Sequence, residues 1–285
     1  MFLKIFSKFI QIYLHKTLII YNFTANLKKD MRITLLGTGT SQGVPVIACD
    51  CEVCVSSNPK DKRLRSSVMI EVDDLNFVID TGPDFRQQML REKVEKVDSI
   101  LFTHHHKDHV AGMDDIRAFN HKWKRDMPIY CNQVTSDALK LEFPYIFSGF
   151  NYPGIPKVAI NIIENKPFNI GKLIIQPIEV LHYKLLVLGF RIKNFVYLTD
   201  VSEISEKEKE KMKGADLIIL DALRKKAHIS HFTLDQALAL LEELKPKQAI
   251  LTHISHYMGL HDDVNYELPN HINLAYDGQV ITLNK

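Results

Sequence analysis

The sequence predicts an α/β domain with a mixed, layered β-sheet, from its composition and from the alternation of short β-rich runs with helical patterns. Of the 285 residues, 46% are hydrophobic and 25% are charged, which is the composition of a globular protein with a full core. This length allows one large domain or two small ones. No repeat, low-complexity tract or linker interrupts the chain after Met31, so we expect one domain.

Charge and hydropathy argue against two classes of protein. The chain has 36 Lys and Arg against 34 Asp and Glu, a formal net charge of +2. A dedicated nucleic-acid binder has a strong basic excess, so we expect no nucleic-acid partner. No apolar run reaches the roughly 18 residues of a membrane-spanning helix, so we also expect no transmembrane span.

Residues 1–30 differ in character from the rest of the chain. Apolar residues recur at helical spacing from Phe2 to Tyr13 with basic residues opposite, as in an amphipathic helix at a membrane surface. The alternative is that translation starts at Met31 and that the preceding residues are an extension outside the fold. We predict the second arrangement, with residues 31–285 as the folded domain.

The predicted strands are short runs rich in β-branched and aromatic residues. Val68–Val72 and Leu75–Ile79 straddle two aspartates and are predicted to form a hairpin. A second hairpin is predicted where an Asp-Gly turn separates Leu274–Tyr276 from Val280–Leu283. Further strands are expected at Arg32–Gly37, Ser99–Phe102, Ile129–Cys131, Val158–Ile163, Leu173–Ile178, Val187–Ile192, Phe195–Leu198, Leu217–Leu220 and Ala249–Leu251.

Helices are predicted where apolar residues recur at helical spacing. The clearest helix begins after Thr233, which is followed three residues later by Gln236, as in a capping box. The predicted helices are Asp84–Glu92, His109–His121, Thr135–Leu141, Ser202–Lys213 and Thr233–Leu244.

The strongest local signal is a histidine-rich motif that directly follows the predicted strand Ser99–Phe102. In this motif His104 and His106 alternate, so both side chains can point toward one position, while Asp108 and His109 turn into the next helix and face a second position. Neutral imidazoles with a carboxylate suit Zn²⁺ or a similar divalent ion. The alternative is a solvated histidine-rich loop that binds metal adventitiously.

Three further potential ligands follow predicted strands later in the chain. His182 comes after a strand that starts at Leu173, Asp200 comes after Phe195–Leu198, and His253 comes after Ala249–Leu251. Taken alone, Asp200 would be interpreted as a helix cap. Asp200 is, however, part of a longer series, and this order favours a metal ligand. The series is His-x-His-x-Asp-His, followed later in the chain by a His, an Asp and a His.

This ligand order resembles that of the metallo-β-lactamase superfamily, and the resemblance runs from about residue 31 to 285. It implies an αββα sandwich of two mixed β-sheets flanked by helices, with a dinuclear site for two divalent ions (Zn or Mn) at one edge. Asp80 matches an aspartate that orders the ligand loop without binding metal. The resemblance places His104, His106 and His182 on one ion, Asp108, His109 and His253 on the other, and Asp200 between both.

Three of the four cysteines form a second candidate metal site. Cys49, Cys51 and Cys54 form a C-x-C-x-x-C run in a polar loop, which is typical of a structural zinc site rather than of a disulfide framework. His256, three residues after His253, is a candidate fourth ligand. Cys131 ends an apolar run and is predicted to be a core residue.

The sequence also resembles one branch of the superfamily, which includes phosphoribosyl cyclic-phosphate phosphodiesterase. The resemblance rests on the Gly-rich turn Gly37–Pro45, the cysteine run, Arg65–Ser67 and the late motif Leu251–His256. In that branch a structural zinc uses the three cysteines and the late histidine, which implies Cys49, Cys51, Cys54 and His256 here.

His231 matches a histidine that assists catalysis in phosphodiesterases of this superfamily. An imidazole there can stabilise the transition state or protonate the departing oxygen, because it titrates near the working pH. The resemblance thus implies His231, Asp200 and Asp108 as catalytic residues. Two alternatives remain: His231 flanks the helix as a structural residue, or His228 takes the role. The turn Gly37–Gly43 is either a phosphate contact or a tight strand exit.

The function predicted from these residues is a dinuclear metal-dependent phosphodiesterase that hydrolyses a small cyclic phosphate or nucleotide-like phosphodiester with a metal-bridging hydroxide. One alternative is a tRNA 3′-processing-type endonuclease, although the segment between His182 and Asp200 is too short for the tRNA-gripping arm of that family. A second is an acyl or thioester hydrolase, and a third is a metal-dependent binding module. We expect a cytoplasmic enzyme, because the cysteines are assigned to metal and no signal peptide is evident. The sequence is compatible with a homodimer.

Overall fold

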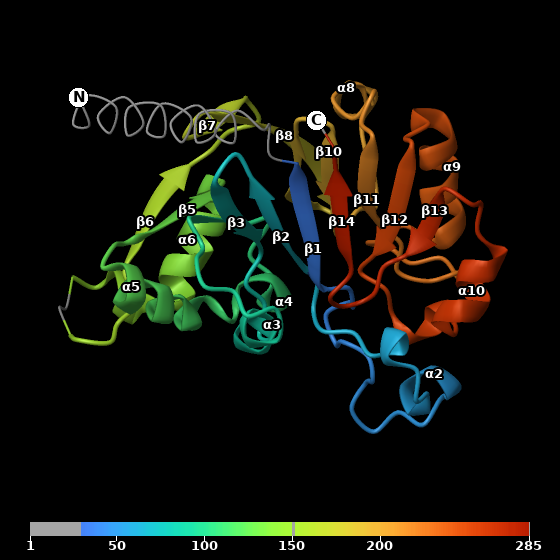
Figure 1. Cartoon of the computed structure of the whole chain (residues 1–285), viewed down its shortest axis with the longest axis horizontal. Helices are drawn as coiled ribbons and strands as arrows, with labels where there is room; N and C mark the ends of the chain where they lie inside the picture. The colour runs from blue at the N-terminus through green and yellow to red at the C-terminus, as the bar shows by residue number, and fades with distance from the viewer. Residues whose placement is uncertain (1–29, 150–151, 285) are drawn as a thin grey trace, which may run out of the picture.

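Two seven-stranded β-sheets pack face to face in the computed structural model, which describes residues 30–149 and 152–284 (Figure 1). Helices cover the outer face of each sheet, so the described part of the chain has the four layers of an αββα sandwich. This is the predicted fold class. The predicted N-terminal extension lies outside the described residues, apart from Asp30.

The first sheet has the strand order β14-β1-β2-β3-β4-β5-β6. Its strands pair antiparallel from β14 to β3 and parallel from β3 to β6. The predicted hairpin formed by β2 and β3 is confirmed. The strands are β1 (Met31–Gly37), β2 (Ser67–Val72), β3 (Leu75–Ile79), β4 (Ser99–Leu101), β5 (Met127–Cys131), β6 (Val158–Ile162) and β14 (Val280–Leu283).

The second sheet has the order β13-β12-β11-β10-β9-β8-β7. Its strands pair antiparallel from β7 to β10 and parallel from β10 to β13. Each sheet therefore has an antiparallel part and a parallel part. The strands are β7 (Phe168–Ile170), β8 (Leu173–His182), β9 (Leu185–Ile192), β10 (Phe195–Leu198), β11 (Leu217–Asp221), β12 (Gln248–Thr252) and β13 (Ile272–Leu274).

Most of the helices lie between strands and pack on the outer faces of the sheets. Helix α9 has the predicted capping box, in which Thr233 and Gln236 satisfy each other's backbone amides. The helices are α2 (Glu52–Val55), α3 (Phe85–Arg91), α4 (Lys107–Val110), α5 (Arg117–Trp123), α6 (Gln133–Glu142), α7 (Pro144–Phe147), α8 (Glu206–Glu210), α9 (Leu234–Leu244) and α10 (His261–Glu267), with short 3-10 turns at Pro59–Asp61, Met113–Ile116 and His256–Met258.

Three apolar clusters hold the layers together. The central cluster joins the facing sides of the two sheets, where Phe77 of β3 meets residues such as Phe190 and Tyr197 of the second sheet. One outer cluster packs α3, α5 and α6 on the first sheet, and the other packs α9 and α10 on the second. Because both faces of each sheet are buried, the strands are largely continuous apolar runs, as expected for sheets covered on two sides.

The predicted C-terminal hairpin is wrong. β13 pairs with β12 in the second sheet, whereas β14 pairs with β1 in the first, so the chain crosses between the sheets at the Asp-Gly turn. Asp277 is not merely a turn residue, because its carboxylate, in a side chain only 10% exposed, accepts hydrogen bonds from the Thr38 hydroxyl and the Leu64 amide, both at 2.8 Å. Long-range partners therefore override the local turn signal.

Two predicted helices also differ from the structure. The pattern over His109–His121 is divided among α4, a 3-10 turn and α5, because Gly112 approaches the backbone of Gly82 and Thr81 closely and its amide donates to Thr81. Only Glu206–Glu210 of the predicted helix Ser202–Lys213 is α-helical.

No helix in residues 30–149 and 152–284 is long and apolar enough to cross a membrane.

Candidate dinuclear metal centre and cysteine site

The candidate metal ligands lie where strands of both sheets end at one edge of the sandwich. The His104–His109 motif follows β4 of the first sheet. His182 ends β8, while Asp200 and His253 follow β10 and β12, all in the second sheet. The fold therefore assembles the seven predicted ligands from two sheets, as expected for polar residues at the carboxyl ends of strands.

One ligand group contains Asp108, His109, Asp200 and His253, whose donor atoms lie within 4.8 Å of one another. Nε2 of His109 lies 3.1 Å from a carboxylate oxygen of Asp108 and 3.1 Å from one of Asp200. Nδ1 of His253 lies 3.3 Å from the same oxygen of Asp200. These four residues match the ligand set expected for one metal.

A second group faces the other side of Asp200. His104 and His106 form one set with Asp200, and His182 forms another with Asp200 and His231. Nε2 of His182 lies 3.8 Å from Oδ1 of Asp200, while the rings of His106 and His182 are 5.2 Å apart. Asp200 thus stands between the two groups, where the bridging ligand is expected.

Backbone conformation helps to aim three of the site residues. Asp80, Asp200 and His253 have φ values of 65°, 55° and 58°, in the left-handed region that non-glycine residues rarely adopt. Each follows the end of a strand, so the turn redirects the side chain away from the alternating pattern of the sheet. Such conformations persist where the surrounding structure enforces them, and they cluster at functional sites.

The donor set fits metal ions. Nε2 of His104 is buried and has no hydrogen-bond partner among the described residues, a costly arrangement unless something binds it. Burial lowers the pKa of His104 well below its usual range, so the ring is neutral, as a ligand must be. Burial alone would raise the pKa of Asp200, but His253 and His109 hold it well below the ordinary value, so this residue is an anion.

Residues around the ligands fix their orientation. The predicted role of Asp80 agrees with its contacts: its carboxylate lies 2.7 Å from Nδ1 of His109 and accepts hydrogen bonds from the Thr103 amide and hydroxyl. The Ser230 carbonyl accepts a hydrogen bond from Nδ1 of His182 at 2.7 Å. These contacts turn the other ring nitrogen of each histidine toward the cluster.

His231 lies beside the candidate ligands, with Nε2 4.0 Å from Oδ1 of Asp200 and its ring 4.5 Å from that of His182. Its Nδ1 lies 3.2 Å from the buried carboxylate of Asp221. Burial would lower the pKa of His231, but Asp221 raises it above the ordinary value. The sequence pattern does not single out Asp221, although its position at the end of a parallel strand matches that of Asp200.

The cysteine run and His256 converge outside this cluster. Sγ of Cys49, Cys51 and Cys54 lie 3.3, 3.4 and 3.4 Å from Nδ1 of His256. The Cys54 backbone amide lowers the pKa of Cys51 to about 6, which favours the thiolate that binds zinc. Burial raises the pKa of Cys54 to about 11, so this thiol would lose its proton only on binding metal. Three cysteine sulfurs and one imidazole form a closed tetrahedral donor set for a structural metal. Cys131 is buried in the outer core of the first sheet, as predicted.

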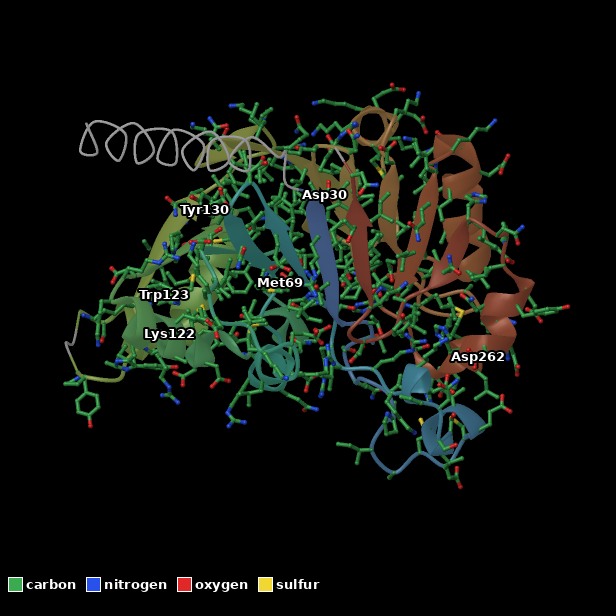
Figure 2. The ribbon with its side chains drawn as sticks, in the orientation of Figure 1. Asp30, Met69, Lys122, Trp123, Tyr130 and Asp262 are labelled. Carbon is green, nitrogen blue, oxygen red and sulfur yellow. The ribbon has the colours of Figure 1, made fainter. Side chains whose placement is uncertain are left out.

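Helix α10 lies beside the cysteine loop. The Asp262 carboxylate, at the edge of the molecule in Figure 2, accepts a hydrogen bond from the Asn58 amide group at 2.9 Å. The buried Asp61 accepts the His261 amide at 2.8 Å. The cysteine loop is therefore anchored to the second half of the chain apart from any metal.

Comparison with known proteins supports this description. The β-lactamase superfamily domain model matches residues 75–254. A crystal structure described as a new diphosphatase from the PhnP family has 39% sequence identity and a TM-score of 0.84, covering 89% of this chain and 98% of that one. The structure of Zn²⁺-bound PqqB from Methylobacterium extorquens, at 16% identity and a TM-score of 0.74, covers 88% of this chain and 100% of that chain and shares the fold.

A curated relative from Porphyromonas gingivalis, named octanoyltransferase, is 38% identical over 251 residues. That match covers 87% of this chain but only 51% of the relative, so the chain spans about half the length of that protein. With the family model, the fold and the buried His/Asp cluster in agreement, the chain belongs to the metallo-β-lactamase superfamily and is similar to a PhnP-family diphosphatase.

Proposed function

We propose that the chain is a dinuclear metal-dependent phosphodiesterase that acts on a small cyclic phosphate or a nucleotide-like diester. The observation that carries this proposal is the pair formed by His231 and Asp221 beside the carboxylate of Asp200. A phosphodiester needs a proton for its departing oxygen, and a histidine whose protonated form is stabilised by a carboxylate can supply it. The diphosphatase described among the relatives also cleaves bonds to phosphorus.

When bound, two divalent ions would supply hydroxide near neutral pH and offset negative charge on the phosphoryl group. His104, His106 and His182 would hold one ion, Asp108, His109 and His253 the other, and Asp200 both. The protein's own residues do the remaining work. Asp221 orients the His231 ring so that Nε2 faces the cluster, and from that nitrogen a proton can pass to the leaving oxygen.

The cysteine site is proposed to hold one structural zinc, which gives three metals for each chain. Its donor atoms are largely thiolates, which zinc prefers, whereas the nitrogen and oxygen donors of the larger cluster accept Zn²⁺ or Mn²⁺ according to availability. We assign no catalytic role to the cysteine site.

The experiment is a metal analysis of the purified chain paired with activity assays in added Zn²⁺ or Mn²⁺. Bis(p-nitrophenyl) phosphate and a cyclic ribose phosphate test the phosphodiester, and S-lactoylglutathione tests the thioester alternative. Three metals per chain with phosphodiester turnover support the proposal. Turnover of the thioester alone would replace it with an acyl hydrolase, and bound metal without any turnover would favour a binding module.

A tRNA-processing enzyme of this superfamily would need a tRNA-gripping arm between His182 and Asp200, and the structure has none there. Between His182 and Asp200 the chain forms only β9, β10 and their connections. These strands belong to the second sheet and pack in the core, so they leave no extended arm to grip a folded RNA.

A further inference from the structure

A buried serine hydroxyl contacts one of the proposed metal ligands, and nothing above assigns it a function. Ser66 directly precedes β2 and is 1% exposed. Its Oγ lies 3.2 Å from Nδ1 of His253, which follows β12 in the second sheet. This contact therefore joins the first sheet to a ligand that the second sheet provides.

The Gly-rich turn after β1 fixes the direction of the Ser66 hydroxyl. The carbonyl of Gly39 accepts hydrogen bonds from the Ser66 hydroxyl and from the Ser66 amide, both at 3.0 Å. Gly39 also forms a bridge pair with Ile254, the residue after His253. A Cβ on Gly39 would lie 2.9 Å from Cβ of Arg63, closer than two such atoms pack. Glycine thus allows the turn to lie between Ser66 and the loop that carries His253.

A second buried hydroxyl lies near the same nitrogen of His253. Thr199 directly precedes Asp200 and is 1% exposed. Its Oγ1 donates to Oδ2 of Asp200 at 2.7 Å and lies 3.2 Å from Nδ1 of His253. Oδ2 of Asp200 itself lies 3.3 Å from that nitrogen. Nδ1 of His253 therefore has two hydroxyl oxygens and one carboxylate oxygen as neighbours.

The hydrogen-bond partners determine where the ring proton of His253 lies. Each hydroxyl has one proton, and a carbonyl or an ionised carboxylate can only accept. Ser66 uses its proton on the Gly39 carbonyl. Thr199 uses its proton on Asp200, so both hydroxyl oxygens offer lone pairs to Nδ1, which must be the N–H donor. A metal-binding histidine is neutral and has one N–H, so its lone pair for the metal lies on Nε2.

We propose that Ser66 and Thr199 are positioning residues that hold His253 with its proton on Nδ1, so that Nε2 is the ligand atom. This inference rests on the proposed dinuclear centre and deepens it, because it names the nitrogen that binds and the hydroxyls that select it. Partners of this kind orient a metal-bound histidine, and their loss typically weakens metal binding by about 10- to 100-fold. Gly39 supports Ser66, which gives the Gly-rich turn a structural function at the metal centre.

The first test is the zinc affinity of the loaded protein, measured by competition with a chromogenic chelator. The wild type should bind three zinc ions per chain. The double variant Ser66→Ala/Thr199→Val lacks both hydroxyls, while the amide of residue 66 can still donate to Gly39. One of the three ions should bind about 10- to 100-fold more weakly to this variant. Ser66→Ala alone should show a smaller loss, because Thr199 remains.

Two variants control for the loss of a buried hydroxyl. Ser136→Ala removes a fully buried hydroxyl from α6, outside both candidate metal sites, and should retain the zinc affinity of the wild type. Ser66→Ala/Thr199→Ser keeps one hydroxyl beside His253 and should bind zinc more tightly than Ser66→Ala/Thr199→Val.

Unchanged zinc affinity in Ser66→Ala/Thr199→Val, folded as judged by circular dichroism, would refute the inference. An equal loss of affinity in Ser136→Ala would refute it as well. If the double variant does not fold, Ser66→Ala decides: weaker zinc binding supports the inference, and unchanged binding refutes it.

A spectroscopic measurement tests the tautomer directly. Long-range nitrogen–proton NMR spectra of the zinc-loaded wild type distinguish a proton on Nδ1 from one on Nε2. His253, assigned through correlations from its ring to its backbone, should carry the proton on Nδ1. A proton on Nε2 would overturn the inference, since Nδ1 would then be the ligand atom.

These measurements separate the inference from the proposed function, because neither of them needs turnover. If the protein binds three zinc ions but hydrolyses no phosphodiester, the proposed reaction fails, and the zinc affinities and the tautomer still decide the inference. Phosphodiester turnover by the wild type, with wild-type zinc affinity in Ser66→Ala/Thr199→Val, would refute the inference and leave the proposed function standing.

Discussion

One carboxylate oxygen of Asp221 accepts two hydrogen bonds, from Nδ1 of His231 at 3.2 Å and from the Val201 amide at 2.9 Å. Val201 directly follows Asp200, the residue between the two ligand groups. The side chain of Asp221 therefore fixes the proposed general acid and the backbone next to the proposed bridging ligand through a single atom, without itself joining either ligand group.

Asp221→Asn tests this link. The amide cannot stabilise protonated His231 as the carboxylate does, so the pKa of His231 should fall toward its ordinary value. His231 must carry a proton to act as the acid, and it would then lose that proton at lower pH. We expect a lower kcat and an alkaline limb of the pH–rate profile shifted to lower pH, with metal content retained.

The control is Asp263→Asn, an exposed carboxylate on α10. Its pH profile should match that of wild type. An unshifted profile in Asp221→Asn would contradict the role given to Asp221.

Replacement of His231 by Ala should leave the metals bound and lower the rate. Loss of a general acid typically lowers the rate by about 10²- to 10⁴-fold. Elemental analysis and steady-state kinetics on the same preparation check both halves of the prediction. If the variant loses metal or fails to fold, as judged by circular dichroism, His231 is a structural residue or a ligand instead.

Asp200→Ala should abolish turnover and also reduce metal content. It removes the carboxylate shared by both ligand groups, which leaves the cluster with less negative charge to offset two cations. Measured metal per chain should fall below that of His231→Ala prepared in parallel. Full activity in the Asp200 variant would overturn the ligand assignment.

Cys51→Ser should remove one zinc per chain and lower the melting temperature. Metal binding in such a site contributes directly to folding free energy, and the hydroxyl of serine is a poorer zinc ligand than a thiolate. Cys131→Ala is the matched control: it removes a buried sulfur from the core and should cost stability without changing the zinc count. Unchanged zinc in Cys51→Ser would exclude the cysteine site as a metal site.

Much of the architecture could be predicted from local signals. Most of the strand runs and the capping box at Thr233 depend on neighbours in sequence, and they are confirmed, whereas β7 was not among the predicted strands. The placement of β13 and β14 in different sheets could not be predicted in this way. It depends on pairing with β12 and β1, which are distant along the chain, and an Asp-Gly turn carries no information about such partners.

In the candidate site, too, local sequence order predicted some residues, whereas others depend on tertiary packing. The order of histidines and aspartates was informative because ligands at strand ends converge in any fold of this class, and the structure brings them together. The partners that orient them were harder to find. Asp221 and the Ser230 carbonyl act through single contacts made by tertiary packing, and a lone aspartate after an apolar strand also fits a helix cap.

The layout of the ligand sets has a mechanical consequence. Each of the three proposed metals takes ligands from both sheets: the His104–His109 motif and the cysteine loop belong to the first, whereas His182, Asp200, His253 and His256 belong to the second. Each ion would thus act as a cross-link between the two halves of the sandwich. The halves could not separate without releasing all three, so metal supply would govern how long the folded chain survives as well as how fast it works.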